Sequence, residues 1–307
     1  MNLTKTNVMK NIILSFALLA LAMGMNSCSN EENSQENTAS QYITVSTEIG
    51  DLTRVSTAAN GTQNFTGGDQ ISVYAWTGKS TSVPAASDRV VDNVINTLNS
   101  GTWTAASQML WKNTTDAHYF IGIYPKTETS VADLTAGNYT FSVNNQEKSD
   151  LLVATNITGL KSASNPVPLT FNHVMAKLKV SLQFRNQWDS TPTVESVTLK
   201  DAATTAKVNY LTQTVTASTT TSSIALPATK TNETYTSVVI PQTGVNSIVI
   251  KIDGKDYTYT NTSGIKLESG KVTSVDLIVG RDKITLGTVS INDWKAGTVI
   301  TGGEAEQ

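Results

Sequence analysis

Residues 247–260 read SIVIKIDGKDYTYT, and this stretch decides the fold class of the chain. Strand-like runs lie on both sides of Asp253 and Gly254. An Asp-Gly pair supplies the positive φ angles that a tight two-residue turn needs, so the stretch predicts a β-hairpin.

Short strand-like runs recur along most of the chain, with turn residues between them. Thr is over-represented, Val and Ile are frequent, and only 15% of the residues are charged. Branched side chains fit a pleated surface, and no stretch beyond the N-terminal segment keeps a 3.6-residue apolar period. The sequence therefore predicts an all-β protein. The runs include YITVSTEI at 42–49, QISVYAW at 70–76, MAKLKVSLQF at 175–184 and KVTSVDLIVG at 271–280.

The strand-like runs are too many for one β-sandwich and suit two sandwiches of seven or eight strands each. A Ser- and Pro-rich segment near residues 161–168 is the best break between them. We therefore expect an N-terminal β-sandwich at residues 41–168 and a C-terminal β-sandwich at residues 169–307.

The N-terminus has the pattern of an export signal. Lys5 and Lys10 precede an apolar run at 12–25, which is shorter than the roughly 20 residues of a membrane span. A basic start, a short apolar run and small residues at its end are typical of a secretory signal peptide.

Cys28 is the only cysteine, and it follows Ser27 at the end of this signal. Bacterial lipoprotein signals end in a small residue followed by the cysteine that receives the lipid. We expect residues 1–27 to be a lipoprotein signal peptide, Cys28 to be lipidated, and the polar residues 28–40 to be a flexible tether. A free, buried thiol is the alternative, but the polar residues around Cys28 offer nothing to bury it.

The acidic stretch after Cys28 resembles the tag that sends some lipoproteins to the outer face of a Gram-negative outer membrane. We therefore expect an outer-membrane, surface-exposed protein. The chain has 22 Lys and Arg against 25 Asp and Glu, with no basic patch. A nucleic-acid partner is not expected.

The sequence offers little chemistry. The two histidines, His118 and His173, have no Cys, His or carboxylate at metal-ligand spacing, and common catalytic and nucleotide-binding motifs are missing. Trp103 and Trp111 have the residue type that stacks on sugars, but aromatic residues at strand spacing are more often core. We expect no catalytic residue, no metal, no cofactor and no enzymatic activity.

Several segments together resemble the fimbrillin (Mfa-like) family of type V pilus subunits. They follow one another in order along nearly the whole chain. These segments are the lipoprotein signal at Cys28, LTRVS around Arg54, GGDQISVYAW, YFIGIYP, SDLLVAT, LTFNHVMAKLKVSL, VVIPQTG and INDWKAGT.

The resemblance implies two tandem transthyretin-like β-sandwiches and a route of assembly. A lipoprotein precursor anchored in the outer membrane through Cys28 is cut by a protease after an arginine in the loop that follows the first strand. Arg54 is the arginine at that place, so we expect the assembled subunit to begin at Val55. The alternative is that Arg54 is an ordinary exposed arginine. The first strand leaves, and its groove accepts a strand from another subunit in a homo- or hetero-polymer.

The C-terminal segment at residues 284–300 is the candidate donor strand. Ile284 and Leu286 alternate with polar residues, as do Val289 and Ile291, and Gly287-Thr288 allows a change of phase between the pairs. Trp294 is a candidate anchor. The alternative is that this segment forms the last strand of its own domain.

Three function classes remain open on the sequence. The leading one is a structural subunit of a cell-surface fimbria. The second is a surface adhesin, or a tip or anchor lipoprotein, that binds host protein or glycan. A β-sandwich enzyme is the third, and it lacks the residue constellations that catalysis needs.

Overall fold

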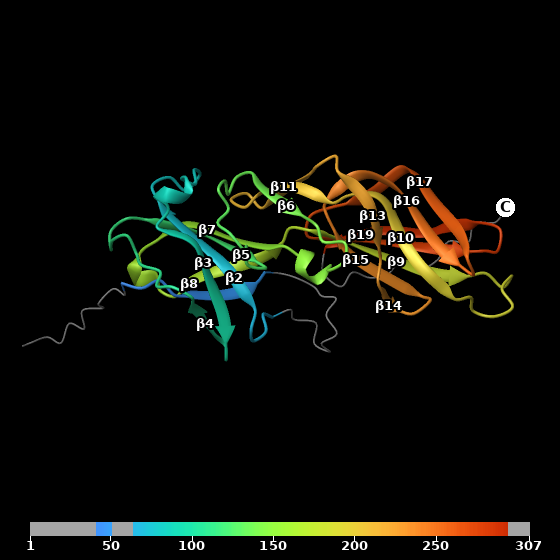
Figure 1. The fold of residues 1–307 in the computed structure, drawn as a ribbon, viewed down its shortest axis with the longest axis horizontal. Coiled ribbons are helices and arrows are strands. Elements are labelled where there is room, and N and C mark those ends of the chain that lie inside the picture. The colour runs from blue at the N-terminus through green and yellow to red at the C-terminus, as the bar shows by residue number, and fades with distance from the viewer. Residues whose placement is uncertain (1–40, 51–63, 294–307) are drawn as a thin grey trace, which may run out of the picture. The chain divides into compact units, whose positions relative to one another are not determined.

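The computed structural model describes residues 41–50 and 64–293, and their regular structure is almost entirely β-strand (Figure 1). This confirms the predicted all-β class. The only helical pieces in the described ranges are three-residue 3₁₀ turns at Ala86–Asp88, Glu147–Ser149 and Ser162–Ser164. Several sheets build the fold, as in a β-sandwich. The tandem transthyretin-like arrangement stays a prediction.

One seven-stranded sheet is built from residues 45–173. Strand β1 (Val45–Ile49) pairs with β8 (Val167–His173) in parallel, whereas the other neighbouring strands of this sheet pair antiparallel. In spatial order its strands are β1 (Val45–Ile49), β8 (Val167–His173), β7 (Leu152–Leu160), β5 (His118–Tyr124), β2 (Gln70–Thr77), β3 (Val91–Asn99) and β4 (Thr102–Ala105).

Residues 176–293 supply two further sheets. One is β13 (Thr221–Ala225), β10 (Val194–Ala203), β16 (Gln242–Ile252) and β17 (Lys255–Leu267). The other is β14 (Ala228–Lys230), β15 (Thr234–Val239), β9 (Ala176–Phe184), β18 (Lys271–Val279) and β19 (Ile284–Asp293). The hairpin predicted at Asp253-Gly254 is confirmed, since both residues have positive φ and Ile252 pairs with Lys255.

A three-stranded sheet crosses the domain boundary predicted at residue 168. It consists of β12 (Thr214–Ala217), β11 (Thr205–Asn209) and β6 (Gly137–Thr140). One cluster of buried apolar residues also includes members from both sides, such as Trp76 and Ile121 with Leu178 and Ile250. The boundary itself stays a prediction.

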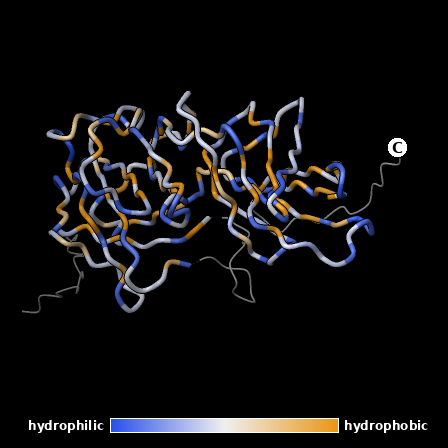
Figure 2. Tube along the Cα trace, turned by 45° about the vertical axis from the view of Figure 1, so that its right-hand side comes forward, coloured by the Kyte–Doolittle hydropathy of each residue, from blue (hydrophilic) through white to orange (hydrophobic). Residues whose placement is uncertain are grey.

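Alternation of polar and apolar residues explains how the strands build the core (Figure 2). In β9 and β18 every second residue is buried, among them Leu178, Val180, Val275 and Leu277. Because successive side chains point to opposite faces of a strand, each strand buries one row. Each aliphatic side chain buried in this way contributes about 1.5–3 kcal/mol before entropy costs.

Candidate functional site

Residues 43–49, which include β1, occupy a position that we call the β1 slot. Their main partner is β8, in a parallel ladder from Val45 opposite Val167 to Ile49 opposite Phe171. Backbone bonds of 2.8 Å hold both ends, from Val167 N to Thr44 O and from Gly50 N to Phe171 O. Just before β1, Ile43 N donates to Met109 O at 2.8 Å.

One face of the segment in the β1 slot belongs to the core. Ile43 and Val45 are 3% and 6% exposed, whereas Ser46 and Glu48 on the other face are exposed. The two buried side chains join an apolar cluster drawn from six other strands and their loops. Its members include Val73, Val91, Trp103, Met109, Phe120, Leu152, Val167, Leu169 and Phe171. Removal of residues 43–49 would therefore open a groove lined by core side chains.

The outer side of β1 faces β4 across a groove of about 500 Å³. The indole Nε1 of Trp103 crosses this groove and donates to Thr47 Oγ1 at 2.8 Å. Phe65 also lines it and packs edge-on against Trp103 at a ring-centroid distance of 5.3 Å and against Phe171 at 5.2 Å. β1 is thus held by a backbone ladder on one side and a side-chain bond on the other.

The chain continues from β1 into residues 51–63, which lie outside the described residues. Arg54 and Val55, the predicted processing site, fall in this segment. Cys28, the predicted lipidation site, and Trp294, the predicted anchor of the donor strand, also lie outside the described residues. These assignments stay predictions.

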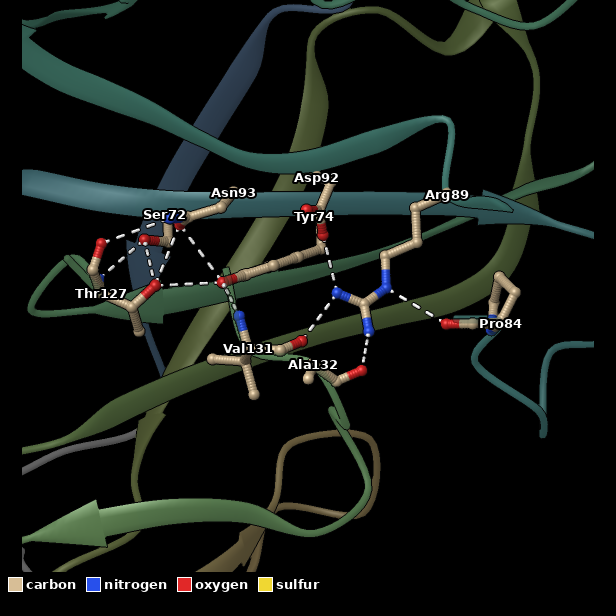
Figure 3. Close-up of polar contacts among 9 residues, drawn as sticks. All are labelled: Ser72, Tyr74, Pro84, Arg89, Asp92, Asn93, Thr127, Val131 and Ala132. Atoms are coloured by element: carbon tan, nitrogen blue, oxygen red, sulfur yellow. Dashed lines mark hydrogen bonds and ion pairs between the residues drawn. The ribbon is translucent and has the colours of Figure 1, made fainter. Parts of the chain in front are cut away.

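Arg89 is an arginine that the fold encloses. Its guanidinium donates to Asp92 Oδ1 at 2.7 Å, to the carbonyls of Val131 and Ala132 at 2.8 Å each, and through Nε to Pro84 O at 3.2 Å (Figure 3). The side chain is 1% exposed. A protease cleft cannot reach an arginine held in this way.

The neighbouring polar network ties the loop after β5 to the sheet. Tyr74 Oη lies 3.0 Å from Thr127 Oγ1 and donates to Asn93 Oδ1 at 3.2 Å, and Ser72 Oγ accepts a bond of 2.8 Å from Thr127 N (Figure 3). Burial raises the pKa of Tyr74, so its hydroxyl stays neutral. The network orders a loop and presents no reactive group.

The turn between β18 and β19 is held by the segment that follows β9. Val279 O accepts bonds from Arg185 N at 3.0 Å and from Trp188 Nε1 at 3.1 Å. Arg281 N donates to Gln187 Oε1 at 3.2 Å, and its guanidinium lies 5.8 Å from the ring centroid of Trp188. These contacts fix the start of β19.

The candidate donor strand lies on β18 of its own chain. Residues 284–293 form β19, which pairs antiparallel with β18 from Val279 opposite Ile284 to Lys271 opposite Asp293. Ile284 packs against the core cluster, but Leu286, Val289 and Ile291 are 39%, 39% and 36% exposed. β19 therefore carries an apolar row that its own chain covers only in part.

A β-bulge at Gly287 makes this row continuous. Leu286 pairs with Leu277 and Thr288 pairs with Asp276, so Gly287 is the extra residue. The bulge places Ile284, Leu286, Val289 and Ile291 on the face of β19 that follows the buried residues of β18. The change of phase that the sequence predicted at Gly287-Thr288 is confirmed.

The histidines have structural partners. His118 is buried, accepts a bond from Lys112 N at Nε2 at 3.1 Å, and has its pKa lowered by burial. His173 Nδ1 lies 2.7 Å from Asp150 Oδ1. In the described part of the chain, His, Cys, Asp and Glu form no group of three or more that could bind a metal ion.

Trp103 and Trp111 are 8% and 7% exposed, which confirms their prediction as core residues. The bond from Trp103 to Thr47 could not be predicted from the sequence, because no sequence pattern reports which strands meet across a groove. Over residues 41–50 and 64–293, no helix has the length and apolar character of a membrane span.

Comparison with known proteins identifies the family. A family model described as fimbrillin-like matches residues 53–294. No curated protein sequence matches the chain.

Solved structures share the fold at low sequence identity. A candidate cell adhesion protein from Bacteroides ovatus ATCC 8483 has a TM-score of 0.64 at 18% identity, covering 84% of this chain and 99% of that chain. One from Bacteroides uniformis ATCC 8492 has a TM-score of 0.63 at 18% identity, covering 83% and 100%. A fimbrial protein from Bacteroides vulgatus ATCC 8482 has a TM-score of 0.52 at 15% identity, covering 82% and 99%.

Proposed function

Because the chain belongs to the fimbrillin-like family, we propose that it is a structural, non-enzymatic subunit of a cell-surface fimbria. The precursor is exported as a lipoprotein, anchored in the outer membrane through Cys28, and cut by a surface protease between Arg54 and Val55. The cut subunits then polymerise with copies of themselves or with other fimbrial subunits by strand exchange.

The observation that carries this proposal is the position of β1. It pairs with β8 alone in the strand order of its sheet, it inserts Ile43 and Val45 into the core, and the Arg54 segment follows it directly. Excision of such a strand leaves the edge of β8 and an apolar groove uncovered. A strand from another subunit can pair with the edge of β8 through backbone hydrogen bonds and fill the apolar groove with alternate side chains.

The C-terminal segment 284–300 is the proposed donor. Its apolar row at Ile284, Leu286, Val289 and Ile291 is partly uncovered on β18, so part of its apolar surface is still available for burial in the groove. Because Leu286 is 39% exposed on β18, its full burial in the groove would gain only part of the about 1.5–3 kcal/mol that a fully exposed aliphatic side chain gains.

N-terminal sequencing of the surface-assembled protein tests the processing step. We expect the assembled form to begin at Val55, and we expect Arg54→Gln to remain a monomer with its lipid attached. Arg281→Gln is the matched control, because it removes an exposed arginine elsewhere in the chain, in the turn between β18 and β19, and it should be processed normally. Assembled material that begins near Cys28 would contradict the proposal.

Acyl labelling tests the anchor. Metabolic labelling with a fatty acid should mark the parent precursor and leave Cys28→Ala unlabelled. Equal label in both proteins would show that Cys28 is not the lipidated residue.

A further inference from the structure

A short sequence pattern occurs twice in this chain. Residues 43–47 read ITVST and residues 284–288 read ITLGT. The isoleucine and both threonines coincide, and the third position is aliphatic in each. The first copy lies in the β1 slot, and the second forms the first half of β19. The proposed donor thus carries three of the five side chains of the segment that it would replace, with leucine in place of valine and glycine in place of serine.

The β1 slot sets three requirements on its occupant. Ile43 and Val45 fill the core positions, and Thr47 accepts the bond of 2.8 Å from Trp103 Nε1. Trp103 is only 8% exposed with β1 in place, so its N–H needs an acceptor from whichever strand fills the slot. A buried donor without a partner is costly, so the occupant of the slot needs a hydroxyl at the place of Thr47.

On β18, the donor segment does not present this set of side chains. The bulge at Gly287 places Leu286 opposite Leu277 and Thr288 opposite Asp276, so Thr288 lies on the face away from Leu286. A strand without a bulge alternates strictly, and Thr288 then shares a face with Ile284 and Leu286. If the bulge persisted in the groove, Val289 would occupy the place of Thr47. Valine has no side-chain atom that can accept the bond from the indole N–H.

We propose that Ile284, Leu286 and Thr288 of a second copy of this chain take the places of Ile43, Val45 and Thr47, in a regular strand parallel to β8, with Trp103 donating to Thr288 Oγ1. This register rests on the proposed strand exchange and specifies it. Trp103 acts as the specificity-determining residue, because it distinguishes a strand that has a hydroxyl at the place of Thr47 from a strand that lacks this hydroxyl.

The register gives the later residues of the donor different roles from those that they have on β18. Val289 takes the place of Glu48, which faces solvent opposite Thr170. The bond of 2.6 Å from Thr170 Oγ1 to Glu48 Oε1 is not reproduced by valine. Binding in the groove therefore depends on residues 284–288 more than on Val289 and Ile291.

Disulfide cross-linking reads the register directly. In the regular strand, residue 289 lies opposite residue 170, whereas in a bulged strand residue 290 does. Full-length chains carrying Thr170→Cys with Val289→Cys should link between subunits of the polymer under oxidation. Chains carrying Thr170→Cys with Ser290→Cys should not, because residue 290 then points to the opposite face of the strand and a disulfide requires Cβ atoms about 3.5–4.5 Å apart. The reverse result would overturn the register and leave strand exchange intact.

Substitution at Thr288 tests the role of Trp103. Thr288→Val should slow formation of the SDS-resistant ladder roughly tenfold, as expected when a buried donor loses its acceptor. Thr288→Ser should restore the rate. Thr285→Val should not slow it, because the Thr285 hydroxyl faces away from Trp103 in the groove and accepts its bond from Arg185 Nη2 only on β18. Combining Thr288→Val with Trp103→Phe should recover most of the loss, because neither partner then remains.

The precursor's melting temperature should be the same in Thr288→Val as in the parent, because Thr288 is half-buried on the polar face of β19. Thr285→Val should lower it slightly, because it removes the acceptor of the 3.1 Å bond from Arg185 Nη2. If Thr288→Val formed the SDS-resistant ladder at the same rate as the parent chain, the proposed role of Trp103 would be wrong. A parent chain that forms no ladder after cleavage at Arg54 would overturn the proposed function and this register together.

Discussion

The segment in the β1 slot and the strand β19 begin with similar patterns and lie at the ends of their sheets, yet their environments differ. In the β1 slot, Ile43 and Val45 are 3% and 6% exposed, whereas Leu286 and Ile291 on β19 are 39% and 36% exposed. Both segments pair along their length with one neighbour, β8 or β18. The difference lies in what covers the side chains.

β1 is covered because β4 approaches it from the far end of the same sheet. Trp103 of β4 bonds to Thr47, and Phe65 packs beside it. In β19 the apolar row extends beyond the buried residues of β18, and a large part of it remains in water. The alternating pattern therefore sets which face of a strand is apolar, while the packing of distant strands decides whether that face is buried.

The largest expected difference is between two isoleucines. Ile43→Ala removes a fully packed side chain and should lower the free energy of unfolding by about 2–4 kcal/mol. Ile291→Ala removes a side chain that is already 36% exposed and should lower it by less than about 1 kcal/mol. Urea denaturation of the two precursor variants measures both, and equal losses would break the comparison.

The contacts of Trp188 at the start of β19 should contribute more to the free energy of unfolding than the side chain of Ile291 near its end. Trp188→Ala removes the bond to Val279 O and the ring contacts with Phe184 and Tyr257. We expect a loss of about 1–3 kcal/mol, because this indole is only partly buried. Hydrogen exchange should quicken in β19 and remain unchanged in β1. Unchanged exchange in β19 would show that these contacts do not hold the strand.

A smaller effect is expected at the bond between β1 and β4. Trp103→Phe keeps an aromatic ring but removes the N–H that Thr47 accepts. We expect a loss of about 0.5–1.5 kcal/mol in the precursor, the net value of one hydrogen bond. Thr47→Val should cost a similar amount, and the double variant should cost less than the sum. Additive losses would argue against a direct interaction.

The smallest effect is expected at Gly287. A Cβ built there would lie 3.1 Å from Asp276 O, closer than an ordinary contact. Gly287→Ala should weaken β19 on β18 by about 0.5–1 kcal/mol. The same residue would face solvent in the β1 slot, at the place of Ser46, so ladder formation should be as fast as in the parent or faster. A slower ladder would indicate that the bulge is needed in the polymer.

Much of the fold could be predicted because its signals are local. The Asp253-Gly254 turn, the alternating rows of β9 and β18, and the change of phase at Gly287 each depend on a few neighbouring residues. Turn geometry and strand period are properties of such short stretches.

The pairing of distant strands could not be predicted in this way. Nothing near Val45 indicates that its partner is Val167, or that the ladder between them is parallel. β6 pairs with β11 across the predicted domain boundary, and the indole of Trp103 meets Thr47 from a strand more than 50 residues away. Such contacts depend on how sheets close, which the local pattern does not specify.

Mixing two full-length variants tests the central claim most directly, namely that β19 of one copy replaces β1 of another. Leu286→Asp is processed and offers an empty β1 slot, but its donor strand carries a charge that cannot be buried. Arg54→Gln keeps its own β1 and offers an intact donor strand. After treatment with an arginine-specific protease that cuts the first variant, each alone should stay monomeric, and the mixture should give one SDS-resistant dimer with one copy of each. A ladder from Leu286→Asp alone, or no dimer in the mixture while the parent chain forms its ladder, would contradict the account.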